Sequence, residues 1–72
     1  MSLGALTPRE RDVLMELAHA RSNAEIAARL HISEATVKVH VGRVLGKLDL
    51  RDRARAVVFG YENGLIRPGV GR

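Results

Sequence analysis

The sequence predicts an all-α domain, a four-helix bundle that contains a helix-turn-helix. Apolar residues recur with the spacing of a helix, and no alternation of apolar and polar residues persists as it would in a strand. Serine or threonine precedes two of these apolar stretches with a glutamate three positions later, which is the pattern of a capping box. The 72 residues make one domain, because a chain of this length can bury only a single compact core.

The first helix is expected over about residues 8–20, within "LTPRERDVLMELAHA". Thr7 caps it, Pro8 suits the first helical position, and Glu10 completes a capping box. The residues expected on its inward side are Leu6, Val13, Leu14 and Leu17.

A second helix is expected over about residues 23–30, in "NAEIAARL", with a capping box formed by Ser22 and Glu25. His31 then falls in a turn where the backbone often needs a positive φ, and histidine is enriched there among non-glycine residues. The residues expected on the inner side of this helix are Ile26, Ala27 and Leu30.

The third helix is expected over about residues 34–48 of "SEATVKVHVGRVLGKL", with Ser33 as its cap. Gly42 and Gly46 lie on its outward side, where each costs about 0.5–1 kcal/mol relative to alanine. The same side carries Ala35 and Val39, so it is small and bare. The inward arc is expected to hold Val37, Val41, Val44, Leu45 and Leu48.

The fourth helix is expected over about residues 53–63, capped by Asp52 and ended by Gly64. It has more apolar residues than one core-facing stripe needs, so the surplus serves either a wider core or a contact with a second copy. The domain is expected to span residues 6–66, between a leader or expression remnant over 1–5 and a flexible tail over 67–72. The apolar residues in question are Ala54, Val57, Val58, Phe59 and Tyr61.

Charge is distributed unevenly along the chain. Residues 1–32 carry four basic and four acidic residues, whereas residues 33–72 carry eight basic and four acidic ones, so the net +4 lies in the second half. With a pI of about 10.7, this asymmetry indicates a polyanionic partner, although a solvated, arginine-rich surface would look the same.

Several classes of protein are disfavoured by composition. The absence of cysteine excludes disulfides and thiolate metal sites, and the three histidines lack ligand spacing, so we expect no metal and no cofactor. No nucleophile–base pair or phosphate-cradling loop occurs, so an enzyme is not expected, nor is a small-molecule substrate. No membrane span or signal peptide is evident, and a cytoplasmic protein is expected.

The second and third helices, joined by a short turn and with the later one basic, form a candidate helix-turn-helix. From Leu6 to Ile66 the chain carries "LTPRE", "SNAEIAARL", "ISEATVKVH", "KL" and "R...AV......GLI". In these motifs it resembles the LuxR-type (NarL/FixJ-like) DNA-binding domain of bacterial transcription regulators. The resemblance implies a four-helix domain that binds double-stranded DNA as a homodimer, with its third helix in the major groove. In many members a receiver or ligand-sensing domain precedes it, as in the response regulators of two-component systems.

Matching positions carry the family's site residues onto this chain. Lys38 and Val39 correspond to groove-facing residues, and Thr36 and Lys47 to positions that commonly meet phosphates. Where some relatives have a basic residue one turn after Val39 this chain has Gly42, so the neighbouring arginine is the candidate substitute. The expected base contacts are Lys38, Val39 and Arg43, the expected backbone contacts are Ser33, Thr36, Lys47 and Arg29, and the expected dimer contacts are Val57, Val58 and Tyr61.

Two alternative functions remain open at the level of sequence. Region 4 of a bacterial sigma factor shares part of the pattern but generally ends near the "KL" of the third helix, and the fourth helix argues against it. A helix-turn-helix that dimerises or docks without reading DNA is the other alternative. Two further residues are expected to be structural: Arg53 by pairing with Glu10, and His40 by packing or hydrogen bonding between helices.

Overall fold

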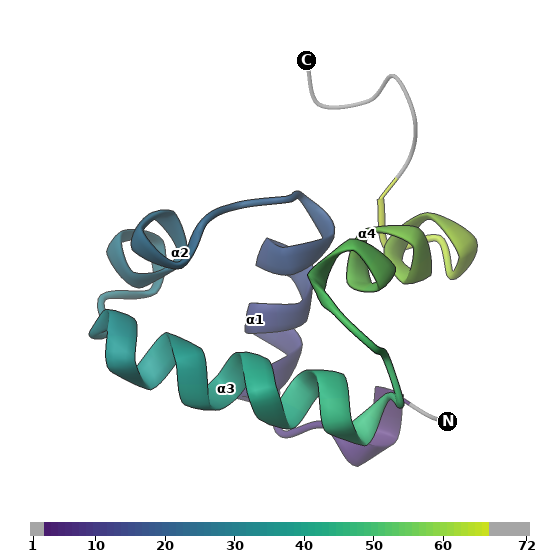
Figure 1. The fold of residues 1–72 in the computed structure, drawn as a ribbon, viewed down its shortest axis with the longest axis horizontal. Helices are drawn as coiled ribbons and strands as arrows, with labels where there is room; N and C mark the ends of the chain where they lie inside the picture. The colour runs from purple at the N-terminus through teal and green to yellow at the C-terminus, as the bar shows by residue number, and fades with distance from the viewer. Residues whose placement is uncertain (1–2, 67–72) are drawn as a thin grey trace.

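The computed structural model describes residues 3–66, and every regular element in that range is helical, which confirms the predicted class. A 3-10 turn, η1 (Leu3–Ala5), precedes four α-helices. The central helix α1 packs against α3 and α4, and α2 packs against α3, so that α2 and α4 lie toward opposite ends of the molecule (Figure 1). No helix within residues 3–66 is long and apolar enough to cross a membrane. The helices are α1 (Pro8–Ala18), α2 (Asn23–Leu30), α3 (Glu34–Lys47) and α4 (Arg53–Glu62).

All four helices begin at the predicted capping residues. Each cap side chain accepts a hydrogen bond from the backbone N–H three residues later, over 3.0 to 3.1 Å. Both predicted capping boxes are complete, because the glutamate carboxylates accept in return from the N–H groups of their caps. The caps are Thr7, Ser22, Ser33 and Asp52.

The four helices also end alike. In each, a residue in the left-handed region turns the chain, and the next N–H bonds back to the carbonyl five residues earlier. Gly64 and His31 take this position as expected, with φ of 70° and 59°. Ala20 and Asp49 do so as well, with φ of 60° and 55°, which the sequence did not predict. The turn at Ala20 ends α1 two residues before the predicted boundary.

The core is formed by the inward residues predicted for the first three helices. Leu30 and Leu45 are only partly buried and pack against its edge. Leu3 packs there too, and its carbonyl accepts from the N–H of Leu6, so residues 3–5 form a turn that the sequence did not predict. The expected tail, 67–72, lies outside the described residues. The predicted residues that are buried are Leu6, Val13, Leu14, Leu17, Ile26, Ala27, Val37, Val41, Val44 and Leu48.

On α4 the smallest residues face inward. Ala56 and Gly60 are buried, and a Cβ placed on Gly60 would lie 2.7 Å from the Cβ of Ala18 in α1. The two helices therefore approach too closely for a side chain at this point. Val58 and Tyr61 remain 43% and 48% exposed, so these two members of the apolar surplus of α4 do not belong to a wider core. Phe59, by contrast, is partly buried and packs against the core.

Candidate nucleic-acid interface

The outer face of α3 is the surface of this helix turned away from α1 and α2. It is exposed along the whole helix, while Val37, Val41 and Val44 hold the opposite side in the core. Val39, at the middle of the outer face, is 54% exposed. The other residues of the face, all exposed, are Ala35, Thr36, Lys38, Gly42, Arg43 and Gly46.

The two glycines of the outer face are not required by internal packing. A Cβ built on Gly42 or Gly46 would meet nothing within 4 Å. At Gly60, by contrast, the neighbouring helix α1 leaves no room for a side chain. Because glycine inside a helix costs about 0.5–1 kcal/mol, the fold itself would be better served by alanine at both outer positions. The glycines leave the backbone of α3 open to close approach from outside.

The cations on this face differ in how they are held. Within residues 3–66, Lys38 and Arg43 have no ion-pair partner, so their charges face solvent. Lys47 instead donates from Nζ to Oε1 of Glu10 over 2.8 Å, across from α3 to α1. Its side chain is still 38% exposed, and an ammonium has three donors, so two remain for another acceptor.

Glu10 joins the start of α1 to the end of α3. Its side chain is 2% exposed, and besides Lys47 it accepts from the N–H of Thr7 over 2.9 Å. The hydrogen bond from Lys47, followed by that from the Thr7 backbone, holds the pKa of the Glu10 carboxyl below its usual range. The sequence predicted the capping role of Glu10 and a pairing with Arg53, but it did not predict the pairing with Lys47, because no local pattern indicates a partner 37 residues away.

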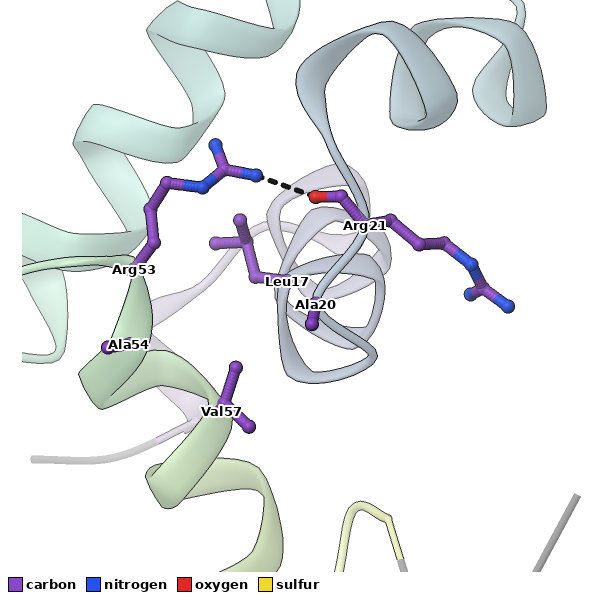
Figure 2. Close-up of a pocket in the computed structure, with 6 residues that line it drawn as sticks. All are labelled: Leu17, Ala20, Arg21, Arg53, Ala54 and Val57. Carbon is purple, nitrogen blue, oxygen red and sulfur yellow. Dashed lines mark hydrogen bonds between the residues drawn. The ribbon is translucent and has the colours of Figure 1, made fainter.

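Arg53 has a structural role, as expected, but the predicted pairing with Glu10 is wrong. Its guanidinium donates to Oδ1 of Asn23. It also donates, over 2.6 Å, to the carbonyl of Arg21 (Figure 2). Glu10 pairs with Lys47 instead. Arg53 thus fixes the start of α4 against the linker that leads into α2.

A second buried carboxylate orients Arg29 on α2. Glu16, 8% exposed, accepts on Oε1 from Nε of Arg29 over 2.7 Å and from Arg21 over 3.2 Å. The Arg29 side chain is 52% exposed, and its other guanidinium N–H groups are not used in this pair. Glu16 therefore ties α2 to α1 while leaving Arg29 donors at the surface.

The start of α3 presents two hydroxyls. Ser33 accepts from the N–H of Thr36 over 3.1 Å and donates to its Oγ1 over 2.9 Å, and both residues are exposed. Further along the helix His40 is half-buried, and its Nδ1 is enclosed without a hydrogen-bond partner. Of the two roles expected for His40, packing is the one that fits this atom.

Comparison with known proteins assigns the chain to a protein family. The luxR family of bacterial regulatory proteins matches residues 4–59, which extends from η1 into α4. The chain belongs to this family. A luxR-family domain is a helix-turn-helix that binds DNA in transcriptional regulators and is not an enzyme. The match reaches the fourth helix, which the sigma-factor alternative does not explain.

Individual relatives agree with the luxR-family assignment. Transcriptional regulatory protein YhcZ of Bacillus subtilis strain 168 is 53% identical over 60 residues, 83% of this chain and 28% of YhcZ. Transcriptional regulatory protein YxjL of the same strain is 46% identical over 61 residues, 85% of this chain and 28% of YxjL. Response regulator protein VraR of Staphylococcus aureus is 44% identical over 62 residues, 86% of this chain and 30% of VraR. The luxR-family domain thus spans less than a third of the length of these relatives.

Proposed function

We propose that this domain binds double-stranded DNA sequence-specifically as a homodimer, with α3 in the major groove, as the output domain of a bacterial transcription regulator. The observation that carries the proposal is the outer face of α3. This face is exposed along the helix and carries glycine at two positions where internal packing would allow a side chain. Lys38, Arg43 and Lys47 surround these positions with positive charge. Such a face suits a polyanionic groove better than it suits solvent.

The dimensions of the groove explain the small residues. A major groove about 12 Å wide admits a helix, and its backbone comes close to base edges only where bulky side chains are absent. Gly42 and Gly46 provide that clearance. Lys38 and Arg43 then reach guanine edges, and the exposed methyls of Val39 suit the methyl group of thymine.

The proposed contacts with the DNA phosphate backbone use side chains whose positions are already restricted by other contacts. Glu10 holds Lys47 and Glu16 holds Arg29, and both cations keep unused donors at the surface. The hydroxyls of Ser33 and Thr36 lie at the start of α3, where a helix favours anions. Less side-chain entropy is lost when such oriented donors meet phosphates.

The remaining parts of the proposal concern partners. The exposed apolar side of α4 supports a homodimer through Val57, Val58 and Tyr61. The much greater length of the relatives, one of them a response regulator, supports a preceding receiver or ligand-sensing domain in the whole protein. A regulator of this kind acts on chromosomal DNA in the cytoplasm.

Selection of bound sequences from a random DNA pool, at two salt concentrations, tests the proposal. We expect enrichment of a paired motif, with log affinity falling against log salt by about 0.9 per phosphate neutralised. Absence of enrichment, with little salt dependence, would favour the interaction module that does not read DNA.

Variants on a single half-site separate the assigned roles. Lys38→Ala should weaken binding to every sequence, because it removes a cation, and should also reduce the preference for guanine at the base it contacts. Val39→Ala should keep the overall affinity closer to that of the wild type and change which bases are preferred. Arg55→Ala on α4 is the matched control for charge and should leave the base preference unchanged. An unaltered preference in Val39→Ala would refute the role of this valine in readout.

A further inference from the structure

One side of α3 carries a line of hydrogen-bond donors. Four residues recur there at intervals of four, three and four positions, a spacing that aligns them along a helix over about 16.5 Å. They offer a hydroxyl, an imidazole, a guanidinium and an ammonium group, and no carboxylate interrupts them. We call this line the donor strip. Its members are Thr36, His40, Arg43 and Lys47.

The donor strip runs along the edge of the outer face of α3 that adjoins α1, because Lys47 at its end donates to Glu10 of α1. Thr36, at its start, accepts from the hydroxyl of Ser33, so its own hydroxyl hydrogen is left for another acceptor. Both ends of the strip are among the phosphate contacts proposed above. His40 lies between them, about 6 Å along the helix from Thr36 and about 10.5 Å from Lys47.

The two nitrogens of the His40 ring have different surroundings. The residue is half-buried, and Nδ1 is enclosed without a hydrogen-bond partner. Within residues 3–66 the other nitrogen, Nε2, is not enclosed and has no hydrogen-bond partner either. One edge of the ring therefore packs against the protein, and the other edge reaches solvent.

This packing determines which nitrogen of the neutral ring carries the hydrogen. A neutral imidazole has one N–H donor and one acceptor nitrogen. An enclosed N–H without an acceptor is rarer and more costly than an enclosed acceptor without a donor. The hydrogen of His40 therefore belongs on Nε2, and the edge of the ring that reaches solvent is a donor held in place by the packing of the opposite edge.

We propose that His40 is a further DNA contact, in which the neutral ring donates from Nε2 to a phosphate oxygen of the strand that Thr36 and Lys47 contact. The inference rests on the proposed function and adds a residue that it does not use. A donor on a phosphate adds affinity without reading a base. Because the ring is neutral, it also adds affinity without displacing a counterion, unlike the cations of the donor strip.

Two substitutions separate donation by His40 from its packing. His40→Phe keeps a ring but has no donor, so half-site affinity should fall by roughly 10-fold to 100-fold. Its melting temperature should be no lower than that of the wild type, because the enclosed nitrogen is replaced by carbon. His40→Gln keeps an N–H donor at the end of the side chain and should retain most of the affinity. Wild-type affinity in His40→Phe, or an equal loss in both variants, would overturn the proposal.

The salt dependence of half-site binding distinguishes a neutral donor from a cation. His40→Phe should leave the slope of log affinity against log salt unchanged, whereas Lys47→Gln should reduce it by about 0.9. Lys47→Gln is the matched comparison, because its amide can still donate to Glu10. A slope reduced as much in His40→Phe would show that the ring acts as a cation.

Neutral methylphosphonates, placed one at a time in the half-site DNA, locate the contacted phosphate. At that position the loss of affinity should be smaller in His40→Phe than in the wild type, because the same hydrogen bond is not lost twice. Losses that simply multiply at every position would show that His40 contacts none of these phosphates.

Nitrogen NMR of the unaltered chain tests the ring directly and does not depend on the folding of a variant. The measurement is made near pH 8, well above the ordinary histidine pKa of about 6.5. The hydrogen should be found on Nε2, and the Nε2 resonance should move when half-site DNA is added. A hydrogen on Nδ1, or an Nε2 resonance that DNA leaves in place, would contradict the assignment.

The two proposals fail in different ways. Absence of half-site binding by the unaltered chain contradicts the proposed function. Half-site binding that is weakened by Lys47→Gln but not by His40→Phe contradicts only the role of His40.

Discussion

Replacing Gly60 with alanine measures how closely α1 and α4 approach each other. The new Cβ would lie 2.7 Å from the Cβ of Ala18 and 3.6 Å from its Cα. The Cβ of Ala18 is fixed by the backbone of α1 and the residue is 1% exposed, so no change of rotamer relieves the overlap. The whole of α4 must move away from α1, which also loosens Ala56 and the ring of Phe59.

The size of the effect follows from two opposing contributions. Overpacking a core costs about 1–3 kcal/mol, and alanine recovers about 0.5–1 kcal/mol of helix stability relative to glycine. The difference spans about 0–2.5 kcal/mol. Because the Cβ of Ala18 cannot move out of the way, we expect Gly60→Ala to lower the free energy of unfolding by about 1–2 kcal/mol. For a domain of this size the melting temperature then falls by roughly 5–15 °C.

Gly42→Ala is the matched control, because it makes the same chemical change where the new Cβ meets nothing within 4 Å. It should raise the free energy of unfolding by about 0.5–1 kcal/mol. Thermal and urea unfolding followed by circular dichroism measure both variants. A Gly60→Ala protein as stable as the wild type, or a Gly42→Ala protein less stable than it, would refute the packing argument.

Four further substitutions probe the buried polar contacts and the helix ends. The lowered pKa of Glu10 stabilises the fold above the ordinary value of 4.5, and this contribution is lost as pH falls below it, so Glu10→Gln should be less stable near neutrality but decline less on acidification. Melting curves from pH 7 to pH 3 check this, and parallel declines would contradict it. Ala20→Gly should stabilise by about 1 kcal/mol and His31→Gly by less, because alanine is the poorer residue in the left-handed region. Arg53→Ala should cost about 1.5–3 kcal/mol in urea unfolding, through loss of its bonds to Asn23 and the α1–α2 linker; a cost near zero would show that they do not hold α4.

Features that depend on residues close together in the sequence were predicted correctly, and features that depend on tertiary contacts were missed. Helix starts were predicted because a cap and its partner are three residues apart, as with Thr7 and Glu10 or Ser22 and Glu25. The left-handed turn at Ala20 was missed, because alanine carries no signal for that conformation. The 3-10 turn of residues 3–5 was missed since its support, the packing of Leu3, comes from the core.

Family resemblance and helical periodicity together predicted the outer face of α3. The exposure of Val39, at 54%, agrees with the prediction from spacing alone. The partners of the flanking cations were not predictable. Lys47 pairs with Glu10 across 37 positions and Arg53 with Asn23 across 30, and no local pattern records such pairs.

The sequence by itself determined the helices, their starts, the core stripe of the first three and the family, because these depend on residues within a turn or two of each other. Only the tertiary structure decided which side of α4 is buried. Both sides are apolar, and the close crossing of α1 admits only the side that carries Ala56 and Gly60. That choice leaves Val58 and Tyr61 outside, and it follows from the shape of a neighbouring helix, which periodicity does not encode.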